Sequence, residues 1–495
     1  MSRSPASTLD PGVFEDYLTR TRWFGGKGRP FVVTDVRTVG VLPGGPPLVV
    51  IHLVELTYGD VDPASGEDPV ELYQVPLSCY EHPETRLDHA FVGWWEDPEH
   101  GWVHAYDALH DREAMALWLR AFDSSATDPS RVGEAENTSR TADESLRFHR
   151  LPGHDLDLEA HSTLFSGEQS NSSVAFGEDA LMKVFRKVTP GANPDITVHA
   201  ELTKAESSHI AALYGWLEAT DPASPENGVL QLAMLQEFLR TATDGFELAL
   251  ASVRSLFADV GDAADTQVHA AESGGDFAPE ATRLGEALRE VHEILRAHFP
   301  TETRPASAAA ELAAQMTDRL TAATTVVPEL GPHAAGVRSV FARVAGLDGL
   351  TVQQVHGDLH LGQTLRTATG WKIVDFEGEP AKPLAERQLP DSPWRDVAGM
   401  LRSFDYAPRV VERAMSEGER ADHVEDFTKE AEQWAERNKN HFLTAYAGGA
   451  LTSQQQTLLD AYVADKAVYE TVYETRNRPT WVEIPLEAVA RIGAA

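Results

Sequence analysis

This sequence has a single cysteine, few basic residues and no long hydrophobic run. Cys79 has no partner for an intramolecular disulfide bond, which fits a reducing compartment. The 42 lysine and arginine residues are outnumbered by 77 acidic ones, so a net charge of −35 repels nucleic acids and anionic membranes. No uncharged apolar run approaches the roughly 20 residues of a membrane helix, and the N-terminal residues lack the apolar core of a signal peptide. We therefore expect a cytoplasmic protein without nucleic-acid or membrane partners.

The chain is long enough for two or three domains, and its pattern changes along the 495 residues. Apolar spacing predicts a short helix within residues 10–30, and β-branched runs between Gly, Pro and Asp clusters predict an antiparallel sheet over 31–110. A helix over 111–122 precedes a polar linker over 123–146. A strand hairpin is predicted within 159–188, and Leu230 to Leu239 form a further apolar stretch. From Phe246 the pattern is mostly helical, with a helix start predicted at 392–393.

One constellation carries most of the chemistry. His356-Gly357-Asp358 is followed by Gln363, and an Asp-Phe-Glu-Gly turn begins at Asp375. Protein kinases space an Asp, a carboxamide and a second Asp in this way: the first takes a proton from the attacking hydroxyl, and the other two bind Mg²⁺. Strand-like runs end at both acidic turns, over 351–355 and 371–374. The alternative is a buried hairpin with polar turn residues.

A lysine inside an apolar strand points to a nucleotide site. Lys183 lies within Leu-Met-Lys-Val-Phe, where a charge is costly unless it has a use, and a strand lysine in kinases contacts the α and β phosphates. Such a lysine needs a carboxylate beside it. Glu201, in a helix predicted to start near residues 194–195, is the favoured partner, with Glu206 and Asp195 as competitors. A lysine on the solvent face of a strand is the alternative.

Two further segments are candidates for binding ATP. A polar turn stands where kinases cover the phosphates, and small hydroxyl and amide side chains with backbone N–H groups bind phosphate oxygens; its candidate residues are Gln169, Ser170, Asn171 and Ser172. An ordinary hairpin turn is the alternative for this segment. Residues 236–239 are placed to link two lobes, and the backbones of Glu237 and Leu239 are candidates for pairing with adenine.

Longer strings resemble a known family. The catalytic segment with Asp375 looks like the aminoglycoside-phosphotransferase-like branch of the kinase superfamily. Strings in the order of the chain are similar to the actinobacterial maltokinases: RWFGG (22–26), QSN (169–171), NPDI (193–196), VHGDLHLGQ (355–363), DFEGEP (375–380), PDSPWRDVAGMLRS (390–403), DKAVYE (465–470) and YETR (473–476). The chain departs from the family at Thr197, where the family usually carries Glu, and this leaves the carboxylate that pairs with Lys183 open.

The resemblance implies a fold, a reaction and partners. The fold is α+β, a bilobal protein-kinase-like fold with an extra N-terminal antiparallel β cap and a mostly helical C-lobe. The cap is expected over residues 1–110, an intermediate subdomain completing the N-lobe over 111–240, and the C-lobe over 241–495. The implied reaction uses ATP and Mg²⁺ to phosphorylate maltose at its anomeric hydroxyl, giving maltose 1-phosphate on a route to α-glucan. A trehalose synthase is the partner that this association suggests.

A helical face near the C-terminus is the candidate acceptor site. Lys466, Tyr469, Glu470 and Tyr473 fall at i, i+3, i+4 and i+7, and Arg476 follows them. Aromatic faces among charged groups suit a disaccharide, whereas a solvated amphipathic face is the alternative. In the catalytic segment, His360 either bonds a sugar hydroxyl or braces the loop, and His356 is expected to brace it. Residues 395–396 are expected to form a structural ion pair.

Other functions are weighed against this one. The nearest rival is a glucosamine kinase or another sugar or aminoglycoside kinase, because the acceptor cannot be read from these motifs. A protein of another class, a catalytically silent kinase-like binding protein, would lack part of the set, yet Asp358, Gln363, Asp375 and Lys183 are all present. A metal-dependent nuclease is disfavoured by the charge of −35.

Overall fold

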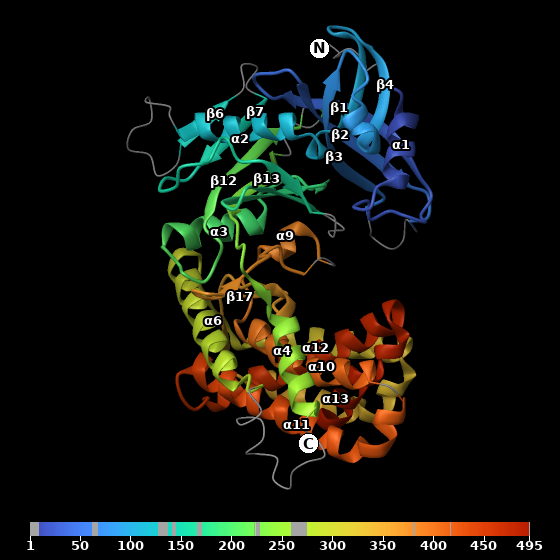
Figure 1. The fold of residues 1–495 in the computed structure, drawn as a ribbon. Coiled ribbons are helices and arrows are strands. Elements are labelled where there is room, and N and C mark those ends of the chain that lie inside the picture. The colour runs from blue at the N-terminus through green and yellow to red at the C-terminus, as the bar shows by residue number, and fades with distance from the viewer. Residues whose placement is uncertain are drawn as a thin grey trace. The chain divides into compact units, whose positions relative to one another are not determined.

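The first strand-rich stretch of the chain forms an antiparallel sheet in the computed structural model (Figure 1). Its strands lie in the order β1-β2-β3-β5-β4, and the short β11 pairs with β3. The bounds are β1 (Phe31–Val41), β2 (Leu48–Tyr58), β3 (Val70–Tyr80), β4 (Phe91–Asp97), β5 (Gly101–Asp107) and β11 (Lys187–Val188). The helix α1 (Pro11–Arg20) precedes them, with η1 (Thr85–Ala90) and η2 (Ala108–His110) in the connections. The predicted sheet and first helix are confirmed.

The structure describes residues 9–61, 68–126, 137–140, 145–165, 171–221, 223, 228–258, 275–379, 382–415 and 417–494. The chain divides into two compact units. Unit 1 comprises Met1–Ala200 and Ala211–Arg240, and unit 2 comprises Glu201–Ile210 and Thr241–Ala495. Among the described residues, no helix is both long and apolar enough to cross a bilayer.

A second antiparallel sheet completes unit 1, in the order β6-β7-β12-β13-β10-β9-β8. Its strands are β6 (Asn137–Arg140), β7 (Leu146–Arg150), β8 (Ser162–Leu164), β9 (Asn171–Phe176), β10 (Ala180–Phe185), β12 (Leu213–Thr220) and β13 (Val229–Glu237), with helices α2 (Arg112–Ala126) and α3 (Pro194–Lys204). The predicted hairpin is confirmed, and most of the apolar stretch from Leu230 lies in β13. The linker expected over 123–146 is wrong in part, because α2 runs to Ala126, and β6 and the start of β7 lie within it. Residues 127–136 and 141–144 lie outside the described residues.

A single apolar core joins the two sheets of unit 1. Trp118 and Phe122 of α2 are fully buried and pack with Phe148 of β7, Phe176 of β9 and Ile51 of β2 in one cluster. The rings of Phe122 and Phe148 meet edge to face at 5.1 Å. Because buried aromatic residues contribute most of the contact area of a core, the cap sheet and the second sheet are stabilised together.

The strand β10 runs directly into the cap. The Gln74 side-chain amide of β3 donates to the Phe185 carbonyl at 2.7 Å, and the Gln74 N–H donates to the Arg186 carbonyl at 2.8 Å. The Arg186 guanidinium, which is 1% exposed, donates to Asp107 at 2.7 Å, and the Tyr17 hydroxyl donates to the same carboxylate at 2.5 Å. Burial alone would raise the pKa of Asp107, but the charges of Arg186 and His110, with the hydrogen bonds from Tyr17 and the Leu109 N–H, together hold that pKa below its usual value. A buried ion pair therefore ties the end of β10 to the cap.

Unit 2 is mainly helical. Its helices are α4 (Gly245–Ala258), α6 (Ala278–His298), α7 (Ala306–Val326), α8 (Ala334–Val344), α9 (Leu384–Arg387), α10 (Trp394–Ala414), α11 (Glu417–Ala447), α12 (Ser453–Asn477) and α13 (Glu483–Ala494), with 3₁₀ turns η5 (Pro328–His333), η6 (Leu361–Gln363) and η7 (Pro479–Trp481). Its short strands are β14 (Thr243–Asp244), β15 (Glu302–Pro305), β16 (Gly349–Val352), β17 (Thr364–Thr367) and β18 (Gly370–Ile373). The expected helical pattern from Phe246 and the helix start after residue 393 are confirmed.

Close helix packing positions the loop between β16 and η6. The helix α10 packs against α12 and contacts η6. A Cβ at Gly399 of α10 would lie 2.3 Å from the Leu359 carbonyl oxygen, so only glycine allows α10 to approach the loop so closely. The loop that contains Asp358 is therefore supported along one side by α10.

Candidate active site

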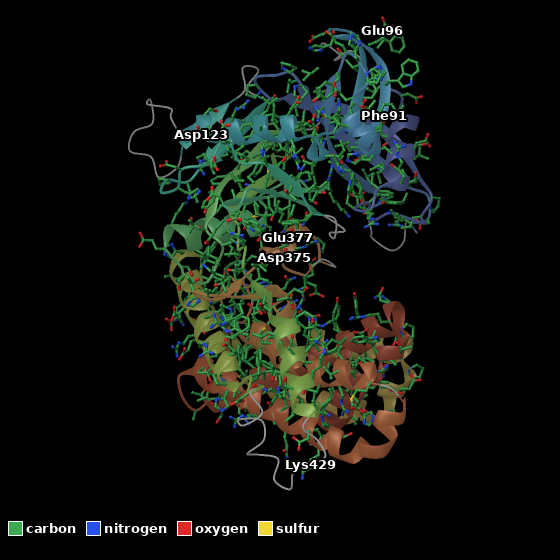
Figure 2. The ribbon with its side chains drawn as sticks, in the orientation of Figure 1. Phe91, Glu96, Asp123, Asp375, Glu377 and Lys429 are labelled. Carbon is green, nitrogen blue, oxygen red and sulfur yellow. The ribbon has the colours of Figure 1, made fainter. Side chains whose placement is uncertain are left out.

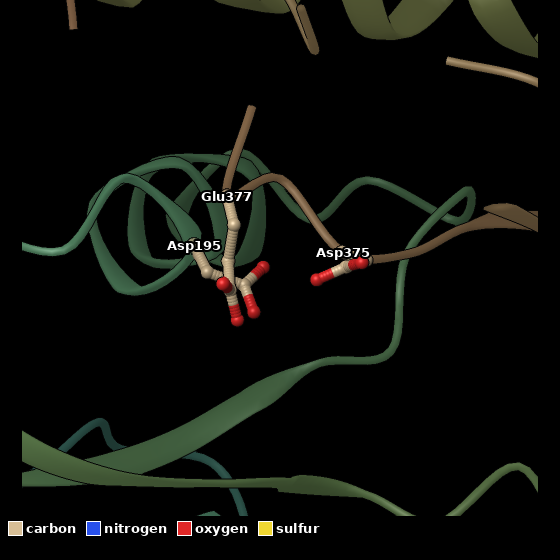
Figure 3. Close-up of side chains that lie close together, drawn as sticks. All are labelled: Asp195, Asp375 and Glu377. Carbon is tan, nitrogen blue, oxygen red and sulfur yellow. The ribbon is translucent and has the colours of Figure 1, made fainter. Parts of the chain in front are cut away.

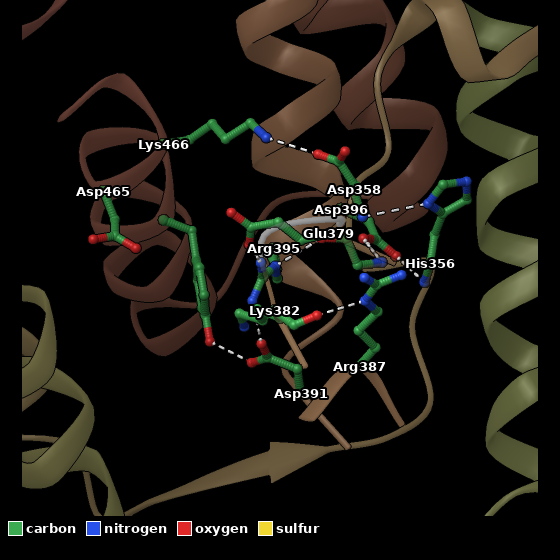
Figure 4. A network of polar contacts seen from close by, with 12 residues as sticks. His356, Asp358, Glu379, Lys382, Arg387, Asp391, Arg395, Asp396, Asp465 and Lys466 are labelled. Atoms are coloured by element: carbon green, nitrogen blue, oxygen red, sulfur yellow. Dashed lines mark hydrogen bonds and ion pairs between the residues drawn. The ribbon is translucent and has the colours of Figure 1, made fainter. Parts of the chain in front are cut away.

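The loop before η6 is held by a buried carboxylate. Asp396, in the first turn of α10, is 1% exposed and accepts the N–H groups of His356 at 2.7 Å and Gly357 at 2.8 Å (Figure 4). The Asp396 carboxylate also contacts His292, whose Nε2 lies 3.0 Å away. Burial would raise the pKa of Asp396, but the bonds and charge around it, His292 foremost, lower it. The carboxylate is therefore ionised and fixes the backbone next to Asp358.

Arg395 holds the same loop from the other side. Its Nε donates to the Gly357 carbonyl at 3.0 Å, and its other nitrogens donate to Asp391 at 3.0 Å and to Glu379. The predicted ion pair between residues 395 and 396 is wrong, because neighbours on a helix point about 100° apart. Gly357 is instead held at both its N–H and its carbonyl, in a left-handed conformation with φ of 88°.

Asp358 faces a lysine from α12. The Lys466 ammonium donates to Asp358 Oδ1 at 3.0 Å (Figure 4). Burial would lower the pKa of Lys466, but Asp358 and Glu470 raise it, so the ammonium stays charged. The structure thus brings the predicted catalytic Asp358 together with one of the predicted acceptor residues.

The second acidic turn follows β18. Gln363 Nε2 donates to Asp375 Oδ2 at 3.0 Å, so the two predicted metal ligands are adjacent. Asp375 has a φ of 67°, a left-handed conformation that costs free energy in a non-glycine residue and is typical of functional turns. Oxygen atoms of Asp375 and Glu377 lie within 4.8 Å of one another, and Figure 3 shows both carboxylates on this turn.

Both acidic turns act on His360. Its Nδ1 accepts the Gly362 N–H at 3.1 Å, so this residue braces the loop as an N-cap of η6. Burial lowers the pKa of His360, although the charges of Asp358 and Asp375 oppose that change. His356 also braces the loop, because its Nε2 lies 3.0 Å from the Val374 carbonyl. The His356 imidazole therefore connects the loop of Asp358 to the segment that leads into the turn of Asp375.

In unit 1, Lys183 of β10 has a carboxylate partner other than the favoured one. Its ammonium donates at 2.8 Å to Asp195, which lies in the first turn of α3 and is 1% exposed. Glu201 bonds Lys204 at 3.0 Å and His298 at 3.2 Å instead, so the favoured assignment is wrong. Six residues further along a helix lie about 120° around its axis, which turns Glu201 away from the face of Asp195.

The Asp195 carboxylate is held in its charged form. Burial raises its pKa, but Lys183 and His199 together lower it far more. The stabilisation is present above the unfolded pKa of about 3.9 and is lost as the pH falls through the lower folded value. The pair is therefore intact at neutral pH.

The predicted phosphate loop is only partly described. Gln169 and Ser170 lie outside the described residues. Asn171 pairs with Phe185 in the ladder of β9 and β10, so it shares a sheet face with Lys183, whereas Ser172 points to the opposite face. The Ser172 hydroxyl accepts a bond from the buried Arg186 at 2.8 Å, so the structure contradicts its assignment as a phosphate ligand.

The predicted adenine-binding segment lies at the end of unit 1. The Glu237 N–H donates to the Ala212 carbonyl at 2.8 Å, and its Oε2 accepts the Ala212 N–H at 3.3 Å. Leu239 is half-buried and lies just before the last residue of the unit, Arg240. The predicted role of both backbones in adenine pairing stays a prediction.

A cavity of about 780 Å³ opens beside Asp358 in unit 2. Asp358, Lys466 and Tyr469 line it, together with side chains that the sequence analysis did not assign to the acceptor: Arg319, Glu379, Lys382, Asp391, Tyr462 and Asp465. Most of these are paired. Tyr462 donates to Asp391 at 2.8 Å, and Arg319 pairs with Asp465 at 2.7 Å. The residues come from α7, α12 and the segment before α10, and such a gathering of distant segments gives no local sequence signal.

The remaining predicted acceptor residues lie in different surroundings. Tyr473 is exposed and stacks on Tyr469 at 6.4 Å between ring centroids. Arg476 is also exposed. Glu470 accepts both Nε and Nη2 of the buried Arg402, at 2.9 and 2.8 Å, so its carboxylate balances an interior charge and its assignment to the sugar is wrong.

The chain is similar to several proteins of known name. Residues 17–111 match the Maltokinase N-terminal cap domain family. A glucosamine kinase of Streptacidiphilus jiangxiensis is 27% identical over 337 residues, covering 64% of this chain and 70% of that protein. A glucosamine kinase of Mycolicibacterium smegmatis is 27% identical over 330 residues, covering 64% and 76%. A solved structure of glucosamine kinase in complex with glucosamine, ADP and inorganic phosphate covers 98% of each chain, with a TM-score of 0.65 and 20% identity.

Residues 17–111 thus resemble the cap domain of maltokinases, and the chain as a whole shares the kinase-like fold of the solved glucosamine kinase structure. Its α+β architecture, with a β cap and a helical second unit, is the one that the resemblance predicted. The two named relatives support a kinase, which is a phosphotransferase.

Asp195 and Glu201 give a matched pair of variants for the lysine contact. We expect Asp195→Asn to lower kcat/KM for ATP at least tenfold, about 1.4 kcal/mol of transition-state stabilisation, because the amide carries no charge to hold Lys183. Glu201→Gln, in the same helix, should stay within about twofold of the wild type. Steady-state kinetics with varied ATP measure both, and a larger loss in Glu201→Gln would restore the original assignment.

Proposed function

We propose that this protein is an ATP-dependent sugar kinase that transfers the γ-phosphoryl group to the anomeric hydroxyl of maltose, giving maltose 1-phosphate. The proposal rests mainly on the cavity of unit 2, where Asp358 and Lys466 form an ion pair beside the exposed ring of Tyr469. A carboxylate beside a half-exposed aromatic ring suits a sugar hydroxyl, because the ring packs on the apolar face of the sugar. The match of residues 17–111 to the maltokinase cap supports maltose as the acceptor.

The charges in the cavity also favour a neutral acceptor. Asp391 and Glu379 are both paired with Arg395, and Asp465 is paired with Arg319. An amino sugar carries a positive charge and would gain most from an unpaired buried carboxylate. These three carboxylates already have arginine partners, so they offer an ammonium group less than free carboxylates would. This supports maltose over glucosamine, which the named relatives make the second candidate.

The residues divide the work of phosphoryl transfer. Asp358 accepts the proton of the acceptor hydroxyl as that oxygen attacks, and the anomeric hydroxyl is acidic enough to ease this step. Lys183, oriented by Asp195, neutralises charge on the α and β phosphates of ATP. Lys466 holds Asp358 in place and balances charge near the acceptor.

The turn of Asp375 fits a magnesium ion. Asp375, Glu377 and the carboxamide oxygen of Gln363 are oxygen donors, which Mg²⁺ prefers. These residues would hold the ion, and the ion would neutralise the charge that develops on the phosphate oxygens. Trehalose synthase stays a proposed partner on association alone.

Removing the proton acceptor should stop transfer without unfolding the protein. We expect Asp358→Asn to lower kcat by about 10²- to 10⁴-fold, because an amide cannot accept the proton, while the ATP dissociation constant changes little. Asp348→Asn, at an exposed position of the same unit, is the control. A coupled ADP-release assay with titration calorimetry for ATP measures both. Near-normal turnover in Asp358→Asn would contradict the assignment.

An acceptor panel tests the substrate. With ATP and Mg²⁺, we expect kcat/KM to be highest for maltose among maltose, glucose, trehalose, glucosamine and an aminoglycoside. Phosphorus NMR of the product should show a phosphate on the anomeric carbon. A preference for glucosamine would support the second candidate, and ATP binding without transfer to any acceptor would identify a silent binding protein.

Two neighbouring tyrosines test the sugar face. Tyr469 lines the cavity, whereas Tyr473, whose ring stacks on that of Tyr469, is not among the described residues that line it. Tyr469→Ala should raise the KM for maltose at least fivefold and leave the KM for ATP within about twofold, since lost ring packing costs roughly 1 kcal/mol. Tyr473→Ala should change the KM for maltose less. Equal effects on both substrates would contradict the assignment.

A further inference from the structure

Two tryptophans lie exposed on the β4–β5 hairpin of the cap. Trp94 is 59% exposed and Trp102 is 54% exposed, and their ring centroids lie 4.9 Å apart at an interplanar angle of 34°. Tryptophan is usually well buried, and exposed aromatic surface of this kind marks an interaction site. Neither indole has a part in the chemistry proposed for Asp358 and Lys183.

The strand register places polar groups beside each indole. Trp94 lies opposite His104 and Glu96 lies opposite Trp102, so these four side chains share one face of the hairpin. Glu96 is labelled on this hairpin in Figure 2. The other face is occupied by the cap core, to which Val103 belongs. The indoles are therefore not needed for the core, and hydrogen-bonding groups flank both of them.

The size of the apolar surface argues against a protein partner. Two indoles offer at most about 500 Å², and here each is already about half covered. A stable protein interface needs about 800 Å² from each partner. Among the described residues of β4 and β5, these two are the large hydrophobic side chains that are exposed. A small ligand with flat apolar faces and polar edges fits the patch better.

We propose that Trp94, Trp102, Glu96 and His104 form a binding site for a neutral oligosaccharide. The C–H faces of sugar rings would pack on the indoles, and sugar hydroxyls would bond the Glu96 carboxylate and the His104 imidazole. A neutral chain fits because Glu96 and the net charge of −35 oppose anionic ligands. The site consists only of cap residues in unit 1, and it does not depend on which sugar is phosphorylated at Asp358.

The test titrates the full-length protein with maltoheptaose, with maltose present at saturation to fill the acceptor cavity. Tryptophan fluorescence and calorimetry should show saturable binding in the wild type. The double variant Trp94→Ala/Trp102→Ala should bind at least tenfold more weakly and keep its kcat with maltose. Val32→Ala, which removes an exposed apolar side chain on β1 of the same cap, should bind like the wild type.

Three outcomes would overturn the proposal. The first is equal binding of maltoheptaose by the double variant and the wild type. The second is no binding of maltoheptaose by the wild type. The third is that no sugar binding is detected while the double variant sediments differently from the wild type. That result would show that the indoles form a contact between copies of the chain. Transfer to maltose is measured separately, so failure here leaves the proposed kinase activity to its own assays.

Discussion

The candidate active site depends on the hydrogen bonds by which α10 fixes the backbone of Gly357. Asp396 accepts a hydrogen bond from the Gly357 N–H, and Arg395 donates one to the Gly357 carbonyl. Gly357 is therefore fixed in a left-handed conformation next to Asp358. A buried ionised carboxylate is costly unless each of its oxygens is bonded, and here both accept backbone N–H groups. Without this arrangement the proposed proton acceptor, Asp358, would have no defined position, and catalysis by positioning requires one.

Hydrogen bonds from the same region also connect the loop of Asp358 to the acidic turn of Asp375. Arg395 reaches Glu379, just after the turn of Asp375, while His356 contacts the Val374 carbonyl just before it. The loop and the turn are therefore parts of one bonded network in unit 2. Gly357 and Gly378 belong to it as well, because a Cβ on Gly357 would lie 3.4 Å from the Gly378 Cα. The segments proposed to bind the acceptor and the metal ion are therefore held by the same network.

Local features of the site could be predicted from the sequence, whereas contacts between distant segments could not. Gln363 lies just before β17 and Asp375 just after its partner strand β18, so their adjacency follows from the spacing of a short hairpin. The partner of Lys183 depended on the phase of α3, which a start signal locates too loosely to choose between Asp195 and Glu201. The assignment of Glu470 to the acceptor site is wrong because its partner, Arg402, lies on another helix. Packing between distant segments decided each of these cases.

The continuation of β10 into the cap limits which insertions this part of the chain can accommodate. The strand that holds Lys183 continues through Arg186 into β11, which pairs with β3. One inserted residue in this stretch would turn the side chains that follow it to the opposite face, and Arg186 would then lose Asp107. The cap thus sets the frame for the lysine, and a shortened homologue lacking it would need a redesigned edge strand. Exchanging caps between relatives requires carrying β10 and β11 along.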